Sequence, residues 1–234
     1  MHQVWFIGFV ATFLGVGIGG VIVYFINGFK RGLGTIYALC AGLILGLISF
    51  GIAPEALRLG NWIILVLGFL AGTIVFTLIH ATLPTKLVSR PEMKTSLFLM
   101  LIISLHNFPI GVILGANIQS DVSHSLLQIL ILHNIPEGMI LFAFVNIAGF
   151  RFLPFVLISF IVSVPVATGV LIGEMMGLQN TYVWSFIISL TVGMIYMVTM
   201  KEILPESIRR SSNIYSVLVA GFAFFLVGCY LLYL

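Results

Sequence analysis

Two copies of one polar hexamer lie inside apolar stretches of this sequence. Residues 106–111 and 133–138 both read His-Asn-x-Pro-x-Gly, 27 residues apart. Within the second copy, His133 and Glu137 are four residues apart and would share one helical face. Together with His106 they offer two imidazoles and a carboxylate, which suit Zn²⁺, Fe²⁺ or Mn²⁺, and the lack of thiolates disfavours copper(I). A hydrogen-bonded helix pair is the alternative reading, but the duplication favours a metal site.

The prolines and glycines of the two hexamers have their own consequences. Neither Pro109 nor Pro136 can donate a hydrogen bond to the carbonyl four residues earlier. Each helix can therefore kink and expose a carbonyl, which lipid permits only where protein or water satisfies it. Gly111 and Gly138 would let neighbouring helices approach closely.

The elements that must position these residues are transmembrane helices. The chain is 61% hydrophobic and 7% charged, whereas soluble domains carry about 25% charged residues. We predict an all-α integral membrane protein forming a single domain over 1–234. A charged residue at the bilayer centre costs about 2.5–3.5 kcal/mol, so Glu137 marks a functional position. The predicted spans are 4–26, 33–55, 61–82, 95–116, 123–147, 152–176, 181–204 and 213–234.

The basic residues predict the orientation of these spans. Eight of the ten lysines and arginines fall in the odd-numbered loops. The positive-inside rule then places both termini outside the cell membrane. These charges form no continuous tract, so no nucleic acid partner is expected.

A short internal echo predicts an inverted repeat. The second span closes with Pro54-Glu55, and Pro205-Glu206 directly follows the seventh; these two spans run in opposite directions in the predicted topology. The echo fits spans 1–3 and 6–8 being related by an axis in the membrane plane, as in many transporters, in a 3+2+3 bundle.

Taken together, the paired motif, the eight spans and the Pro-Glu echo resemble the ZIP (Zrt/Irt-like) family of divalent metal transporters, especially its bacterial branch. The resemblance implies a transporter, not an enzyme, that moves zinc, iron, manganese or cadmium into the cytoplasm by alternating access. It places the ion between spans four and five. The partners are then the divalent metal substrate and the lipid bilayer, with no tightly bound cofactor, and a homodimer is left open.

The resemblance also assigns roles to individual residues. His106, His133 and Glu137 match ligands of the family's primary metal site. Asn107 and Asn134 match positions that contribute to an adjacent second site.

Two further residues are expected at the cytoplasmic side. Glu202 matches an acidic residue of the exit route, and His80 ends the third span near it, where it either assists release or anchors the helix.

Three positions depart from the family. Bacterial relatives usually carry acidic residues where this chain has Ile110, Gly51 and Val164. Because Ile110 replaces the carboxylate that bridges two ions, we expect one strong metal site rather than a binuclear one.

The motifs of several other functions are missing from the sequence. The sequence lacks His-Glu-x-x-His, Gly-x-Ser-x-Gly and Walker motifs, which disfavours a zinc protease, a serine hydrolase and an ATP-driven pump. A bis-His haem protein with His106 and His133 as axial ligands is one alternative. A ZIP-like protein that binds or senses metal without transporting it is another.

Overall fold

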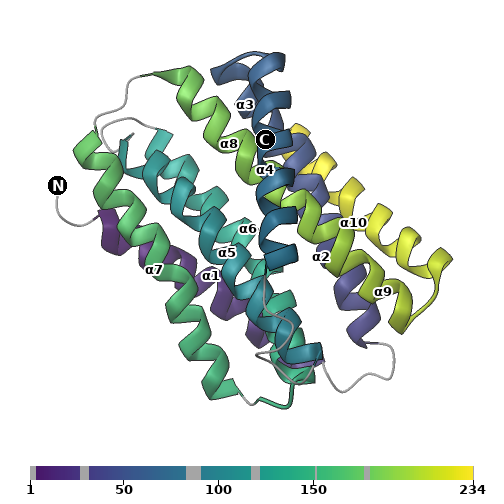
Figure 1. The fold of residues 1–234 in the computed structure, drawn as a ribbon. Coiled ribbons are helices and arrows are strands. Elements are labelled where there is room, and N and C mark those ends of the chain that lie inside the picture. Colours follow the sequence, from purple (N-terminus) through teal and green to yellow (C-terminus); the bar gives the residue numbers. More distant parts are fainter. Residues whose placement is uncertain are drawn as a thin grey trace. The chain divides into compact units, whose positions relative to one another are not determined.

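The protein is described by a computed structural model over residues 4–26, 32–82, 91–116, 122–150, 152–176 and 180–233. Within these ranges the regular structure is entirely helical, and eight helices are long and apolar enough to cross a membrane. Two of the eight are composite, each being an α-helix that continues through a π-helical segment into a shorter α-helix (Figure 1). The elements are α1 (Val4–Ile26), α2 (Gly32–Leu47), η1 (Ile48–Ile52), α3 (Ala53–Leu59), α4 (Trp62–Thr82), α5 (Pro91–Ala116), α6 (Val122–Ile147), α7 (Phe152–Met176), α8 (Thr181–Val198), η2 (Thr199–Ile203), α9 (Leu204–Arg210) and α10 (Asn213–Tyr233).

The second and seventh spans are longer than the sequence predicts. Their predicted ends were 55 and 204, whereas the helices continue to Leu59 and Arg210. The Pro-Glu pairs therefore lie inside these spans and do not end them.

The π-helical segments explain how the helices pass their prolines. In η1 and η2 the first residue after the segment donates its N–H to the segment's first carbonyl, five residues earlier. Pro54 and Pro205 follow one residue later. A proline lacks an N–H and its ring clashes with the carbonyl four residues back. The wider π turn takes up that mismatch before the proline, so the helix is not interrupted.

The chain divides into two compact units. Unit 1 comprises Met1–Val21 and Thr85–Asn180, and unit 2 comprises Ile22–Pro84 and Thr181–Leu234. Unit 1 thus holds most of α1 together with α5, α6 and α7, and both hexamers lie in it. Unit 2 holds α2 to α4 and α8 to α10.

In unit 1, the helices that carry the hexamers each pack closely against a neighbouring helix at a glycine. α5 packs along α7, and a Cβ added at Gly111 would lie 2.2 Å from the Val166 carbonyl oxygen. On α6, a Cβ at Gly138 would lie 2.1 Å from the Val16 carbonyl oxygen of α1. Both distances are far below van der Waals contact, so the predicted close approach at Gly111 and Gly138 is confirmed.

In unit 2, α4 packs along α8 and α10 along α2 (Figure 1). The Ser185 hydroxyl, near the start of α8, donates to the Ala56 carbonyl at 2.7 Å. The Ser207 hydroxyl, in α9, donates to the Gly34 carbonyl at 2.9 Å. Because the start of each composite span meets the end of the other, these two spans run antiparallel. The wider inverted repeat, which includes the first and sixth spans, stays a prediction.

Candidate metal centre

Three potential metal ligands from the two hexamers converge in unit 1. One donor atom each from His106, His133 and Glu137 lies within 4.8 Å of the other two. All three side chains are buried, with His106 only 1% exposed. His133 and Glu137 share a face of α6 because they are four residues apart, and His106 reaches them from α5. The structure therefore brings together the three residues that the sequence singled out.

The orientation of the His106 ring is set by a backbone carbonyl. Nδ1 lies 3.0 Å from the Ile102 carbonyl oxygen, which can only accept, so Nδ1 carries a proton. Nε2 then faces Glu137 Oε1 at 2.9 Å. Among the described residues, neither Nε2 of His106 nor Oε2 of Glu137 has a hydrogen-bond partner of good geometry. A lone pair facing a carboxylate oxygen at this distance is repelled by it, and a cation bound by both atoms would remove that repulsion.

The two asparagines of the hexamers orient their amides in the same way. Asn107 Nδ2 donates to the Val162 carbonyl of α7 at 3.1 Å, and Asn134 Nδ2 donates to the Leu130 carbonyl at 2.6 Å. Since carbonyls accept only, the amide nitrogens are fixed there. Both Oδ1 atoms are left buried with no hydrogen-bond partner among the described residues, and are the ends free to meet a cation.

Ile110 occupies the position on α5 that corresponds to Glu137 on α6. It packs against an apolar core cluster of unit 1 formed by Ala11, Leu114, Leu130, Val166 and Val170. Its side chain offers no ligand atom. Position 110 is therefore partly buried and packs against the apolar core of unit 1.

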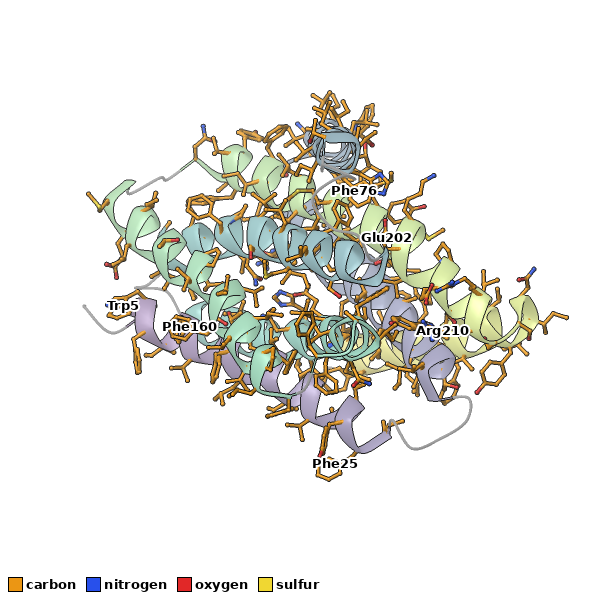
Figure 2. The ribbon with its side chains drawn as sticks, turned by 60° about the horizontal axis from the view of Figure 1, so that its bottom comes forward. Trp5, Phe25, Phe76, Phe160, Glu202 and Arg210 are labelled. Atoms are coloured by element: carbon orange, nitrogen blue, oxygen red, sulfur yellow. The ribbon has the colours of Figure 1, made fainter. Side chains whose placement is uncertain are left out.

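A second titratable pair lies in unit 2. Nε2 of His80, at the end of α4, is 3.2 Å from Oε1 of Glu202 in η2. The Glu202 side chain is 17% exposed and that of His80 54%. Phe76 stacks on the His80 ring with centroids 5.8 Å apart, and Figure 2 shows Phe76 and Glu202 in the same region of unit 2. The expectation that His80 lies near Glu202 holds.

Sequence reasoning missed two features of these sites. The first is Ile102, whose carbonyl orients His106. Its place one helical turn before the histidine was the available signal. The second is the environment of Glu206, to which the sequence assigns no contact. Its side chain is only 12% exposed and accepts hydrogen bonds from Arg209 at 2.8 Å and from Arg210.

Eight helices long and apolar enough to cross a membrane, with a buried cluster of two histidines and one carboxylate in unit 1, define a multi-pass membrane protein equipped to bind a divalent transition metal. The sequence matches the ZIP Zinc transporter family over residues 85–234. The chain belongs to this family, whose members are transporters of divalent metal and not enzymes. A comparison with curated proteins finds no match.

Proposed function

We propose that the protein carries a divalent transition metal, with zinc as the first candidate, into the cytoplasm through a site made by His106, His133 and Glu137. The observation that supports this most is the convergence of their donor atoms within 4.8 Å in a buried setting. Two imidazoles and a carboxylate leave a tetrahedral ion one open position. A site with an open position can exchange its ion, which a carrier requires.

The charge of the site also suits a transported ion. Two neutral imidazoles and one carboxylate leave a divalent ion with one net positive charge. Metal–ligand bonds of about 2.0–2.2 Å require only a modest contraction of a cluster whose donor atoms span up to 4.8 Å. The site is therefore close to binding geometry without being locked onto an ion.

All three ligands belong to unit 1, which bears on alternating access. A movement of unit 1 would carry the bound ion with its coordination intact. In the mechanism we propose, the complete site faces one side of the membrane and then the other, and no ligand is supplied or withdrawn by unit 2.

We propose one strongly bound ion per site. Asn107 and Asn134 present amide oxygens, but Ile110 supplies no carboxylate to neutralise a second cation beside the first. Native mass spectrometry of the protein loaded with excess zinc should show a single tightly held ion. Two ions held with similar affinity would contradict this assignment.

The orientation and the exit route belong to the same proposal. With both termini outside the cell membrane, the ends of α4 and α8–α9 face the cytoplasm. His80 and Glu202 then form a pair of potential ligands on the exit side. The short distance of 3.2 Å between them supports a shared cation there.

Two substitutions test the central site. We expect Glu137→Gln and His133→Ala to abolish zinc uptake into proteoliposomes and to weaken zinc binding in detergent, while the thermal unfolding temperature stays near that of the wild type. Glu174→Gln is the matched control, because Glu174 is a second acid of unit 1 that lies on α7, outside the cluster. Wild-type uptake by both site variants would refute the assignment.

The same preparations separate the alternatives. A protein that only binds or senses metal would bind zinc with no uptake in any preparation. A haem protein would show a Soret band in its visible spectrum that disappears in His133→Ala.

A further inference from the structure

The two halves of unit 2 repeat their contacts at a fixed offset of 151 residues. A Cβ added at Gly42 would lie 2.1 Å from the Ala220 carbonyl oxygen, and one added at Gly193 would lie 2.2 Å from that of Phe69. Gly42 corresponds to Gly193 and Phe69 to Ala220 at this offset. The tight glycine contact that joins α2 to α10 is thus repeated between α8 and α4.

The polar contacts follow the same offset. Asn61 Oδ1 accepts the N–H of Ile64 at the start of α4, and Ser212 Oγ accepts that of Tyr215 at the start of α10. Ion pairs of 2.8 Å join Glu55 to Arg58 and Glu206 to Arg209. The hydrogen bond from Ser185 to the Ala56 carbonyl and the one from Ser207 to the Gly34 carbonyl are also equivalent at this offset. Gly34 corresponds to Ser185, and Ala56 corresponds to Ser207. Because glycine contacts, hydrogen bonds and ion pairs all repeat at the same offset, each residue in one half of unit 2 can be matched to one residue in the other half.

The same register connects the His80–Glu202 pair with a second, apolar pair. Glu202 corresponds to Gly51, and His80 corresponds to Leu231. These two residues also face each other, because a Cβ added at Gly51 would lie 3.5 Å from Leu231 Cδ1. One packing arrangement therefore occurs twice, once with an imidazole and a carboxylate and once without any ligand atom.

The two pairs lie at opposite ends of unit 2. The composite spans run antiparallel, as the Ser185–Ala56 and Ser207–Gly34 bonds show. Gly51 lies in η1, near the end of one composite span, and Glu202 lies in η2, near the end of the other. The side chains that could hold a divalent ion are consequently present at one end and absent from its counterpart.

We propose that Gly51 and Leu231 make the two ends of unit 2 differ in their ability to bind a divalent ion. His80 and Glu202 hold a divalent ion briefly at one end of unit 2, whereas Gly51 and Leu231 leave the equivalent position at the other end unable to do so. The proposal rests on the proposed transport function. We call two side chains that bind the ion briefly, such as His80 and Glu202, a holding pair. A holding pair cannot change the equilibrium distribution of the ion across the membrane that a passive carrier reaches. It lowers the metal concentration that half-saturates flux from its own side.

The test exchanges the two pairs. Gly51→Glu with Leu231→His gives both ends the holding pair, and a Cβ fits at Gly51 because the nearest atom is at ordinary contact distance. His80→Leu with Glu202→Gly gives both ends the apolar pair. Should that variant fold poorly, His80→Asn with Glu202→Gln removes the holding pair with little change in size.

Zinc flux is measured from each side of proteoliposomes that contain uniformly oriented protein. For the wild type we expect the half-saturating concentration to be about tenfold lower from the His80–Glu202 side, equivalent to ~1.4 kcal/mol. We expect both exchanges to abolish that difference, the first by lowering the value on the opposite side and the second by raising it on the His80–Glu202 side. A tenfold difference that persists in either exchange overturns the proposal.

The number of zinc ions bound per protein distinguishes a failure of this proposal from a failure of the central-site assignment. In a Glu137→Gln background, we expect the Gly51→Glu, Leu231→His exchange to bind one more weakly held zinc than its parent, and His80→Asn, Glu202→Gln to bind one fewer. Unchanged counts would overturn the proposal. A wrong central site would instead appear as Glu137→Gln retaining its tightly held ion, whatever happens at the two ends.

Discussion

Replacing Gly138 by alanine should separate α6 from α1 and disturb the metal centre. The added Cβ would lie 2.1 Å from the Val16 carbonyl oxygen and 2.6 Å from its Cα. Ordinary contact begins near 3.4 Å, so the helices must move apart by about 1 Å at this point. Because both obstructing atoms belong to the backbone, no side-chain rotation can relieve the clash. We expect a loss of stability of about 1–3 kcal/mol, as for other overpacked cores.

The displacement should also weaken metal binding, because Glu137 is the preceding residue. In a bound site the metal–ligand distances lie within about 0.2 Å of their standard values, so a larger separation of the ligands must be reversed when the ion binds. We therefore expect zinc affinity to fall by about 10–100-fold, the usual effect of losing a residue that orients a ligand. Isothermal titration with zinc and thermal unfolding in the same detergent measure the two effects.

Gly17 provides the control on α1, next to Val16. A Cβ at Gly17 meets no atom within 4 Å, and alanine favours helix over glycine by up to about 1 kcal/mol. Gly17→Ala should therefore be as stable as the wild type or slightly more stable, with unchanged zinc affinity. If Gly138→Ala behaved like Gly17→Ala in both measurements, the close packing of α6 on α1 would be wrong.

Two further predictions concern the core and the helix contacts of unit 2. Ile110→Glu places a carboxylate against the apolar cluster that holds Ile110. It should lower the unfolding temperature in chelator and make that temperature rise more with zinc than it does in the wild type; an unchanged zinc response would refute this. Ser185→Ala and Ser207→Ala each remove a buried hydrogen bond to a carbonyl, at a cost of about 1 kcal/mol. Since the two bonds lie at opposite ends of unit 2, their effects should add in the double variant, and strong non-additivity in denaturant titrations would contradict the antiparallel arrangement.

What the sequence determined follows from local rules. An apolar fraction of 61% with 7% charge leaves lipid as the only suitable solvent, and this predicted the eight helices. The shared face of His133 and Glu137 follows from the helical period alone. The close helix contacts at Gly111 and Gly138 were predicted because glycine lacks the Cβ that would prevent them.

Other features depended on which helices pack together, which one sequence does not specify. The carbonyl of Ile102 turns His106 toward Glu137, and only the packing of α5 beside α6 makes that contact useful. Ile110 appeared in the sequence as a missing ligand, and the structure shows that it is partly buried and packs against an apolar cluster with members on α1, α5, α6 and α7. His80 and Glu202 are far apart in sequence, and α4 and α8 had to pack together before their 3.2 Å contact could form. The second and seventh spans continue four and six residues beyond their predicted ends of 55 and 204, and the π turns before Pro54 and Pro205 keep these helices continuous at the prolines.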